Sequence, residues 1–106
     1  MASPVKVSEA VRSALAEGRP VVALESTIIA HGLPRPQNLQ AAHDFEALLT
    51  DAGVTAATIA VIDGVPTVGL NDKELERIAL SDDVVKVSSR DLAVAVGRHA
   101  SGATTV

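Results

Sequence analysis

One carboxylate, Glu25, stands where an apolar stretch gives way to a loop rich in turn-forming residues. Val21–Leu24 precede it and predict a short strand buried on both faces, while Pro34 and Pro36 follow in the loop. Strands of this kind end at the rim of a sheet, where ligands usually bind. Glu25 is therefore a candidate acid–base residue, or alternatively an acidic strand-end residue that pairs with a nearby Arg or Lys.

Two other groups could bind a ligand that carries phosphate or sugar oxygens. Lys86 lies inside a valine-rich strand pattern, so its ammonium group must reach the sheet rim or a carboxylate. There it could bind an oxygen as a point charge, or it could simply extend into solvent from an edge strand. The segment 102–106, Gly-Ala-Thr-Thr-Val, could cradle a phosphate with its N–H groups and hydroxyls, although the same composition is typical of an ordinary turn.

The remaining titratable residues show no compact pattern. His31, His43 and His99 have no spacing typical of metal ligands, and the chain has no cysteine. The sequence therefore predicts no metal site made from these residues. Asp82-Asp83 indicates a solvated turn, and Arg90-Asp91 indicates either a helix start or a clamp for a ligand.

Alternating helix and strand patterns must position these side chains. Apolar periodicity and capping residues predict helices from Ser8 to Gly18, from Leu39 to Gly53 and from Asn71 through Leu80. The second helix is expected to bury Leu39, Ala42, Phe45, Leu48 and Leu49. Core strands are expected at 21–24, 58–62 and 84–88, with a hairpin through Asp63-Gly64 whose second strand, 65–68, contains Pro66 and forms an irregular edge. The pattern predicts an α/β fold with alternating helices, mostly parallel strands and one β-hairpin.

Composition limits the possible partners. The 106 residues suffice for one domain, but 47% are apolar and only Phe45 is aromatic, so the core must be built from small side chains and leans on good packing or on further chain. The net charge of −4 and the scattered basic residues argue against a nucleic-acid polymer as partner. No apolar segment resembles a signal peptide or a membrane span, so the expected location is the cytoplasm.

Several motifs together resemble the N-terminal part of the pseudouridine-5'-phosphate glycosidase family, from about Val5 onward. They occur in the family's order: Ala-Leu-Glu-Ser-Thr-Ile-Ile at 23–29, His-Gly-Leu-Pro at 31–34, Pro-Gln-Asn at 36–38, Ala-Thr-Ile-Ala at 57–60, Ile-Asp-Gly at 62–64, Val-Gly-Leu at 68–70, Lys-Val-Ser at 86–88, Arg-Asp-Leu at 90–92 and Gly-Ala-Thr-Thr-Val at 102–106. Residues 1–106 are thus expected to form the N-terminal portion of such a domain.

The resemblance implies reversible cleavage of the C–C glycosidic bond of pseudouridine 5'-phosphate to uracil and ribose 5-phosphate, the activity of a glycosidase or carbon–oxygen lyase. It implies that Glu25 is the proton donor and that Lys86 and Val106 contact the substrate. Breaking a bond to C5 of uracil requires a positioned acid, and partial burial could raise the proton affinity of such a carboxyl group. The resemblance also implies a homotrimer for the complete enzyme.

The family pattern continues beyond these residues. It includes a Gly-rich loop, an Asp that holds Mn²⁺ and a later lysine that attacks the sugar as a nucleophile. None of these falls within 1–106, so this chain is expected to supply no metal ligand and to be inactive, and unstable or self-associating, when isolated. Two alternatives remain: a non-catalytic α/β module that binds a phosphorylated sugar or nucleotide through Lys86 and Thr104-Thr105, and a structural piece of a fusion with a ribokinase-like partner.

Overall fold

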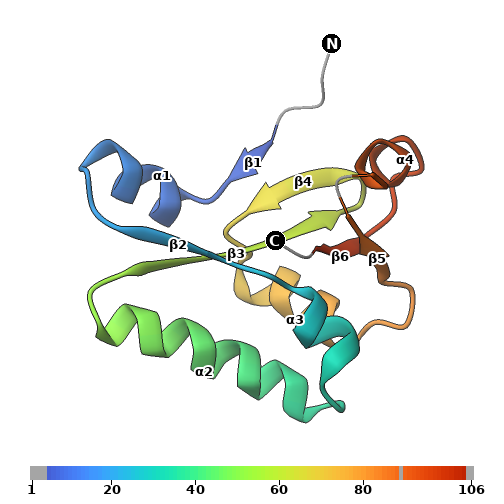
Figure 1. Cartoon of the computed structure of the whole chain (residues 1–106), viewed down its shortest axis with the longest axis horizontal. Coiled ribbons are helices and arrows are strands. Elements are labelled where there is room, and N and C mark those ends of the chain that lie inside the picture. Colours follow the sequence, from blue (N-terminus) through green and yellow to red (C-terminus); the bar gives the residue numbers. More distant parts are fainter. Residues whose placement is uncertain (1–4, 89, 105–106) are drawn as a thin grey trace.

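The computed structural model describes residues 5–88 and 90–104, which form a sheet with helices on both faces (Figure 1). Helices and strands alternate along most of the chain. In chain order, the elements are β1 (Lys6–Val7), α1 (Glu9–Ala16), β2 (Val21–Leu24), the π-helical turn η1 (Ile28–Gly32), α2 (Gln37–Asp51), β3 (Thr55–Ile62), β4 (Val65–Val68), α3 (Asp72–Leu80), β5 (Val85–Val87), α4 (Leu92–Gly97) and β6 (Gly102–Thr104). The predicted α/β class is confirmed.

Local sequence signals account for the helix ends. Ser8 caps α1 by accepting a hydrogen bond from the Val11 amide at 3.2 Å, and Gly18 takes the left-handed conformation after the helix. Asn71 and Glu74 form the predicted capping box of α3, each side chain accepting a hydrogen bond from the other residue's amide. These three expectations are confirmed because caps depend on neighbouring residues alone.

β3 is the centre of the sheet. The strand order is β1-β4-β3-β6-β5, and β2 also pairs with β3. Among the described strands, β1–β4, β2–β3 and β5–β6 are parallel pairs, whereas β3–β4 and β3–β6 are antiparallel. The predicted hairpin exists, but its place at the sheet edge is wrong, because β1 adds to β4. Pro66 is tolerated there since β1 pairs only with Thr67 and Val68 and leaves the proline without a partner on that side.

Two apolar cores lie on opposite faces of this sheet. On one face, Ala60 of β3 and Ala103 of β6 pack with η1, α2 and α3 around Leu75 and Ile78. On the other face, Val61 packs with Val87 of β5 and Ala95 of α4. Figure 1 shows the same layering, with α1 and α4 above the strands and α2 and α3 below them.

Several predictions of burial are wrong. β2 is not buried on both faces, because Val22 and Ala23 are exposed on a strand that pairs only with β3 among the described residues. β5 is likewise an edge strand with Val85 and Lys86 exposed. On α2, Ala42 is buried as expected, but Phe45 is 38% and Leu48 is 69% exposed. The 102–104 segment is strand β6 rather than a tight turn, because it pairs with β3 and β5.

The β3–β4 turn is held by an ion pair. Asp63 and Gly64 both have positive φ angles, and a Cβ atom on Gly64 would stand 2.7 Å from the His99 Cα, which only glycine avoids. The two terminal guanidinium nitrogens of Arg77, Nη1 and Nη2, each donate to one oxygen of the Asp63 carboxylate at 2.6 Å. These hydrogen bonds hold the pKa of Asp63 below its usual value.

This ion pair predicts a stability change in acid. Because the pKa of Asp63 is lower in the folded chain, its contribution is present above the unfolded pKa of about 4 and is lost as the pH falls through the folded pKa. Asp63→Asn, which tolerates the same positive φ, is therefore expected to reduce the loss of unfolding free energy on acidification. Urea unfolding followed by circular dichroism between neutral and acidic pH measures this slope. In a double-mutant cycle with Arg77→Gln, a coupling that persists at the lowest pH would contradict the assignment.

No helix within residues 5–88 and 90–104 combines the length and apolar character needed to cross a membrane.

Candidate active site

The carboxyl ends of β2 and β6 meet beside β3. β2 runs parallel to Thr55–Thr58 of β3, while β6 runs antiparallel to Ala60 and Val61 of the same strand. The two strands therefore approach each other along one edge of β3, and their ends are joined by the hydrogen bond from the Ser26 amide to the Thr104 carbonyl at 3.0 Å. We call this meeting point of 24–26 and 104 the strand junction. Crevices outside the carboxyl ends of strands, where chain direction changes, are common ligand sites in α/β proteins.

Ser26 holds the strand junction together. Its side chain is fully buried, and its hydroxyl donates to the Ile59 carbonyl at 2.5 Å and accepts from the Thr104 amide at 2.9 Å. The Thr104 hydroxyl adds a hydrogen bond to the same Ile59 carbonyl at 3.1 Å. The Ser26 hydroxyl group thus links the end of β2 to β3 and β6, although the three strands are distant in sequence. Ser26 was not predicted to be a site residue, although a serine directly between a strand-end acid and an apolar segment is a signal for such a role.

Removing the Ser26 hydroxyl should loosen this junction. Ser26→Ala leaves the buried Thr104 amide without its acceptor, and we expect a loss of about 1–3 kcal/mol in unfolding free energy. Urea unfolding measures the loss. Ser13→Ala is the matched control, because the Ser13 hydroxyl contacts only an exposed carboxylate, Glu9, at 3.4 Å; its effect should stay within about 0.5 kcal/mol. Equal effects of the two substitutions would contradict the role of Ser26.

Glu25 lies directly before Ser26 and is exposed. Its predicted position at the end of a strand is confirmed, but the partial burial expected for its carboxyl group is absent. Because its neighbour Ser26 is fixed to β3 and β6, the backbone that carries Glu25 is held at the strand junction. An exposed carboxyl group on a fixed backbone can reach a ligand at this sheet rim.

Lys86 borders the same junction from β5. The register pairs Val87 with Thr104, the residue bonded to Ser26, and pairs Lys86 with Ala103. Lys86 therefore lies one residue before the position that pairs with Thr104, on a strand that does not pair with β2. Lys86 is exposed, as both readings of its sequence context allowed. Val106, the third residue named by the resemblance, lies outside the described residues.

A hollow of about 200 Å³ lies beside Lys86, between β5 and α4. Its lining combines three charged side chains with apolar ones. The lining residues are Val85, Lys86, Val87, Asp91, Val94, Ala95, Arg98 and Ala100. Asp91 accepts hydrogen bonds from the hydroxyl and the amide of Ser88, at 2.9 and 3.2 Å, and they lower its pKa. Asp91 thus occupies the N-cap position of α4, but its carboxylate binds Ser88 and makes no capping hydrogen bond to the helix.

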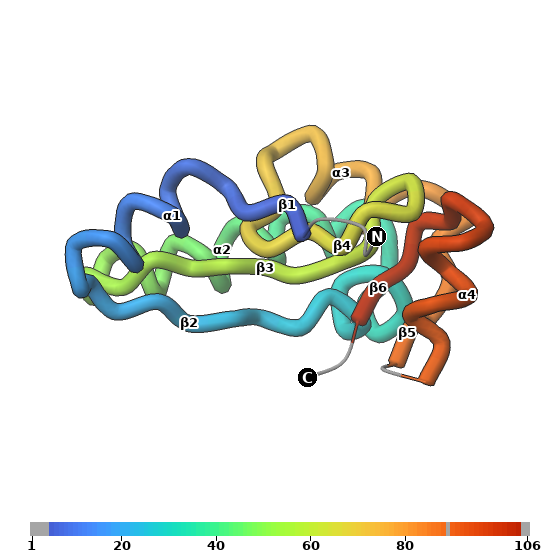
Figure 2. The backbone as a smooth tube through the Cα atoms, turned by 90° about the horizontal axis from the view of Figure 1, so that it is seen from above, coloured from blue at the N-terminus to red at the C-terminus, as the bar shows by residue number. Residues whose placement is uncertain are grey.

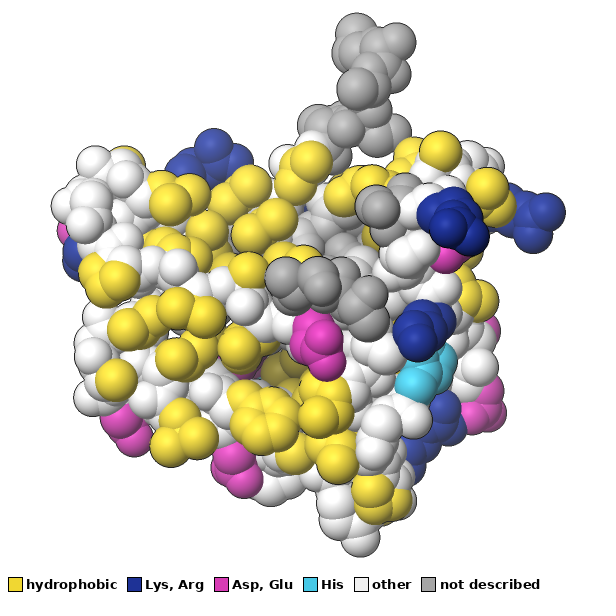
Figure 3. Space-filling model, in the orientation of Figure 1, with side chains coloured by type: hydrophobic (Ala, Val, Ile, Leu, Met, Phe, Trp, Pro, Cys, Tyr) yellow, Lys and Arg dark blue, Asp and Glu magenta, His cyan; other side chains and the backbone are white. Residues whose placement is uncertain are grey.

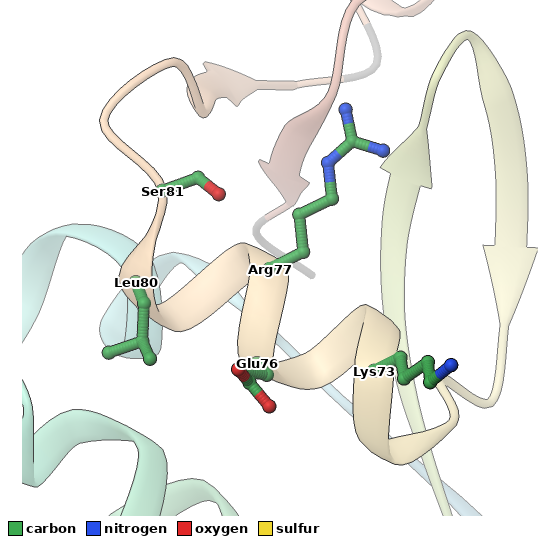
Figure 4. Close-up of a pocket in the computed structure, with 5 residues that line it drawn as sticks. All are labelled: Lys73, Glu76, Arg77, Leu80 and Ser81. Carbon is green, nitrogen blue, oxygen red and sulfur yellow. The ribbon is translucent and has the colours of Figure 1, made fainter.

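A larger hollow, of about 380 Å³, lies along the outer side of α3 (Figure 4). Its charged lining comes from Lys73, Glu76 and Arg77, and Leu80 and Ser81 complete it. The guanidinium group of Arg77 is already paired with Asp63. Neither Glu25 nor Lys86 lines this hollow, so it is not part of the candidate site.

The predicted manganese ion finds no ligand set among the described residues. Residues 5–88 and 90–104 contain no group of three or more His, Cys, Asp or Glu side chains that could hold a metal ion. His31 is exposed in η1, and His99 lies by the β3–β4 turn.

Comparison with known proteins gives a consistent result. Residues 10–106 match the family model described as indigoidine synthase A like protein. The chain is 61% identical over 100 residues to a pseudouridine-5'-phosphate glycosidase of Saccharopolyspora erythraea, an alignment that covers 94% of this chain and 33% of that protein. An Arabidopsis thaliana protein of the same name is 52% identical over 98% of this chain and 32% of its own length. The chain thus spans about a third of these relatives and corresponds to their N-terminal portion.

A solved structure shares the fold. The crystal structure of a prealnumycin C-glycosynthase in complex with ribulose 5-phosphate superposes with a TM-score of 0.83 and 38% identity, over all of this chain and 34% of that one. The arrangement around β3 is therefore one that a known C-glycoside-forming protein also uses.

Proposed function

The chain belongs to the indigoidine synthase A-like family, and we propose on that basis that it forms the proton-donating part of a pseudouridine-5'-phosphate glycosidase. The observation that carries this proposal is the 61% identity, across 94% of the chain, with the Saccharopolyspora erythraea protein of that name. The positions of Glu25 at the strand junction and of Lys86 on β5, which pairs with β6, support it, because a glycosidase needs an acid and a substrate-binding cation at the same rim.

The proposed reaction converts pseudouridine 5'-phosphate and water to uracil and ribose 5-phosphate. The bond between C1' of the ribose and C5 of the base breaks, and its electron pair remains with C5, which takes a proton. C1' receives the oxygen of water, by way of the later nucleophilic lysine that the resemblance implies. A carbon leaving group departs poorly unless it is protonated, so a positioned general acid is the main requirement. Glu25 is the proposed donor.

Lys86 and Val106 are the proposed substrate contacts. The ammonium group of an exposed lysine beside a 200 Å³ hollow can pair with a phosphate or sugar oxygen. The solved relative that was crystallised with ribulose 5-phosphate supports a pentose 5-phosphate as the bound class. Val106 follows β6 by two residues in sequence, and its contact is proposed from the resemblance alone.

Three further features are proposed from the resemblance alone. The complete enzyme is a homotrimer, it acts in the cytoplasm, and it uses Mn²⁺. In this proposal the metal ligands and the nucleophilic lysine come from polypeptide that corresponds to the remainder of the relatives. The chain described here contributes the acid and part of the substrate site.

Uracil release from pseudouridine 5'-phosphate tests the proposal. This chain is assayed alone and joined to the remaining two-thirds of the Saccharopolyspora erythraea relative, with Mn²⁺ present. We expect release only from the joined protein. If the joined protein folds but releases no uracil, the substrate assignment is wrong. If the 106 residues alone release uracil robustly, the nucleophile does not come from the remaining two-thirds. Tight binding of the substrate by the isolated chain, with no release from the joined protein, would favour a non-catalytic binding module.

A further inference from the structure

One side of the sheet ends in an unprotected edge strand. Among the described residues β2 pairs only with β3, so its second edge presents unpaired amide and carbonyl groups. In Figure 2 no other strand lies beyond β2 on that side. Soluble proteins usually protect such edges with charged residues, proline or a covering segment. β2 has the sequence Val-Val-Ala-Leu and contains neither charge nor proline.

Exposed apolar side chains also lie on β2 and on one helix from each of the two layers. They come from α1, β2 and α2: Leu15 is 63% exposed, Val22 40%, Phe45 38% and Leu48 69%. Figure 3 views the molecule onto this side and shows hydrophobic side chains gathered over α1, β2 and α2, with one acidic side chain near the middle of the view and others toward the margin. We call the β2 edge and these four side chains the open face. Exposed apolar patches of this kind mark interaction surfaces.

The open face adjoins the candidate active site. Glu25 follows the last residue of β2, so any segment that pairs with β2 also reaches the strand junction. The sheet ends at β2 in the front of Figure 1, although helices continue above and below it. Parallel strands between two helical layers are usually buried on both faces, so an exposed apolar strand in this place is one that further polypeptide can cover.

We propose that the open face binds polypeptide that corresponds to the remaining two-thirds of the family's relatives, through a strand that pairs with β2. The relatives are about three times as long as this chain, and one that is 61% identical to it carries this region within that longer chain. A second copy of this chain offers β2 only short edge strands, β1, β2 and β5, of two to four residues. This inference rests on family membership and on the open face, and does not depend on which reaction the assembled protein performs.

Reassembly from two polypeptides tests the proposal. This chain, carrying an affinity tag, is co-expressed with the part of the Saccharopolyspora erythraea relative that follows the matching region. That relative's own N-terminal third, paired with the same part, is the positive control. We expect a complex with equal numbers of the two polypeptides by light scattering. Hydrogen exchange should show the amides of Val21–Leu24 that face away from β3 slowed about tenfold or more relative to the chain alone.

Matched substitutions locate the contact. Val22→Lys places a charge on the open face and is expected to weaken the complex about tenfold or more. Val65→Lys is the control, because Val65 is a strand valine of nearly equal exposure, 38%, in β4, which lies between β1 and β3. It should leave the affinity within about twofold.

Three outcomes would overturn the inference. They are no complex where the positive control assembles, a complex in which the β2 amides exchange as in the free chain, and a β2-mediated homodimer of this chain that persists with the second polypeptide present. A complex that forms as expected but releases no uracil would instead contradict the proposed function and leave the inference standing.

Discussion

Replacement of Glu25 by glutamine should lower the turnover number for uracil release about 10²- to 10⁴-fold in the joined protein. Glutamine keeps the size of the side chain and its hydrogen-bonding reach but cannot donate the proton that C5 of the base requires. KM should change little, because the lost interaction belongs to the transition state. Steady-state assays of uracil release, read for kcat and KM separately, measure both effects.

Glu17→Gln is the control for this experiment. Glu17 is also an exposed glutamate, but it follows α1 and pairs with Arg19 at 3.1 Å, away from the strand junction. Its replacement should leave kcat unchanged within about twofold. Equal kcat values for Glu25→Gln and the unmodified protein would show that another group protonates the base.

The second large effect is expected at Asn38, in the first turn of α2. Its side chain is fully buried, and its amide nitrogen donates to the Ile29 carbonyl at 2.8 Å and to the Ala79 carbonyl at 2.5 Å. One side chain thus connects η1, α2 and α3, while its own amide oxygen is buried without a partner in the described contacts. Asn38→Asp turns the donor into a buried carboxylate that faces two carbonyl oxygens, and should cost about 3–5 kcal/mol.

This loss is a large fraction of the about 5–15 kcal/mol that stabilises a typical domain, so the variant should be largely unfolded. Asn38→Leu, which lacks the charge, should lose less, about 2–4 kcal/mol, for the two carbonyl groups left unpaired. Asn71→Asp makes the same chemical change at the α3 cap, where only the acceptor oxygen is used, and should stay within about 0.5 kcal/mol. Far-UV circular dichroism with urea measures all three. A smaller loss for Asn38→Asp than for Asn38→Leu would contradict this account.

The two residues differ in how visible their roles are in the sequence. Glu25 stands at a boundary between an apolar strand and a loop, and its motif marks the family, so it could be proposed without coordinates. Asn38 and Ser26 are small polar residues that also lie in family motifs. Their hydrogen-bond partners are 41 and 33 positions away, so their burial depends on distant parts of the chain. Hydrogen bonds over such separations leave no periodic signal in a single sequence.

The elements themselves were largely predictable. The α1 and α3 caps, the left-handed Gly18 and the Asp63-Gly64 turn depend on residues close in sequence, and the structure confirms each of them. β1 and β6 were not predicted, because strands of two and three residues carry too little alternation to be recognised. β6 nevertheless joins β5 to β3 and forms half of the strand junction.

Burial was less predictable than secondary structure. The apolar run Val21–Leu24 has the composition of a central strand, yet Val22 and Ala23 are exposed at the sheet edge. Phe45 and Leu48 follow helical periodicity, yet their side chains are exposed rather than packed in the core. An apolar pattern records which face a residue prefers to bury, and it cannot say whether the covering segment belongs to this stretch of chain.

The sequence alone determined the α/β class, the helix caps and the family, because local propensities and ordered motifs are properties of neighbouring residues. Only the tertiary structure decided that β2 and β6 meet end to end, that Ser26 joins them to β3, and that Lys86 on β5 lies one strand away from the junction that holds Glu25. The physical reason is that strand order and register arise from hydrogen bonds and packing between distant segments. Those contacts are set by the whole fold rather than by any one motif.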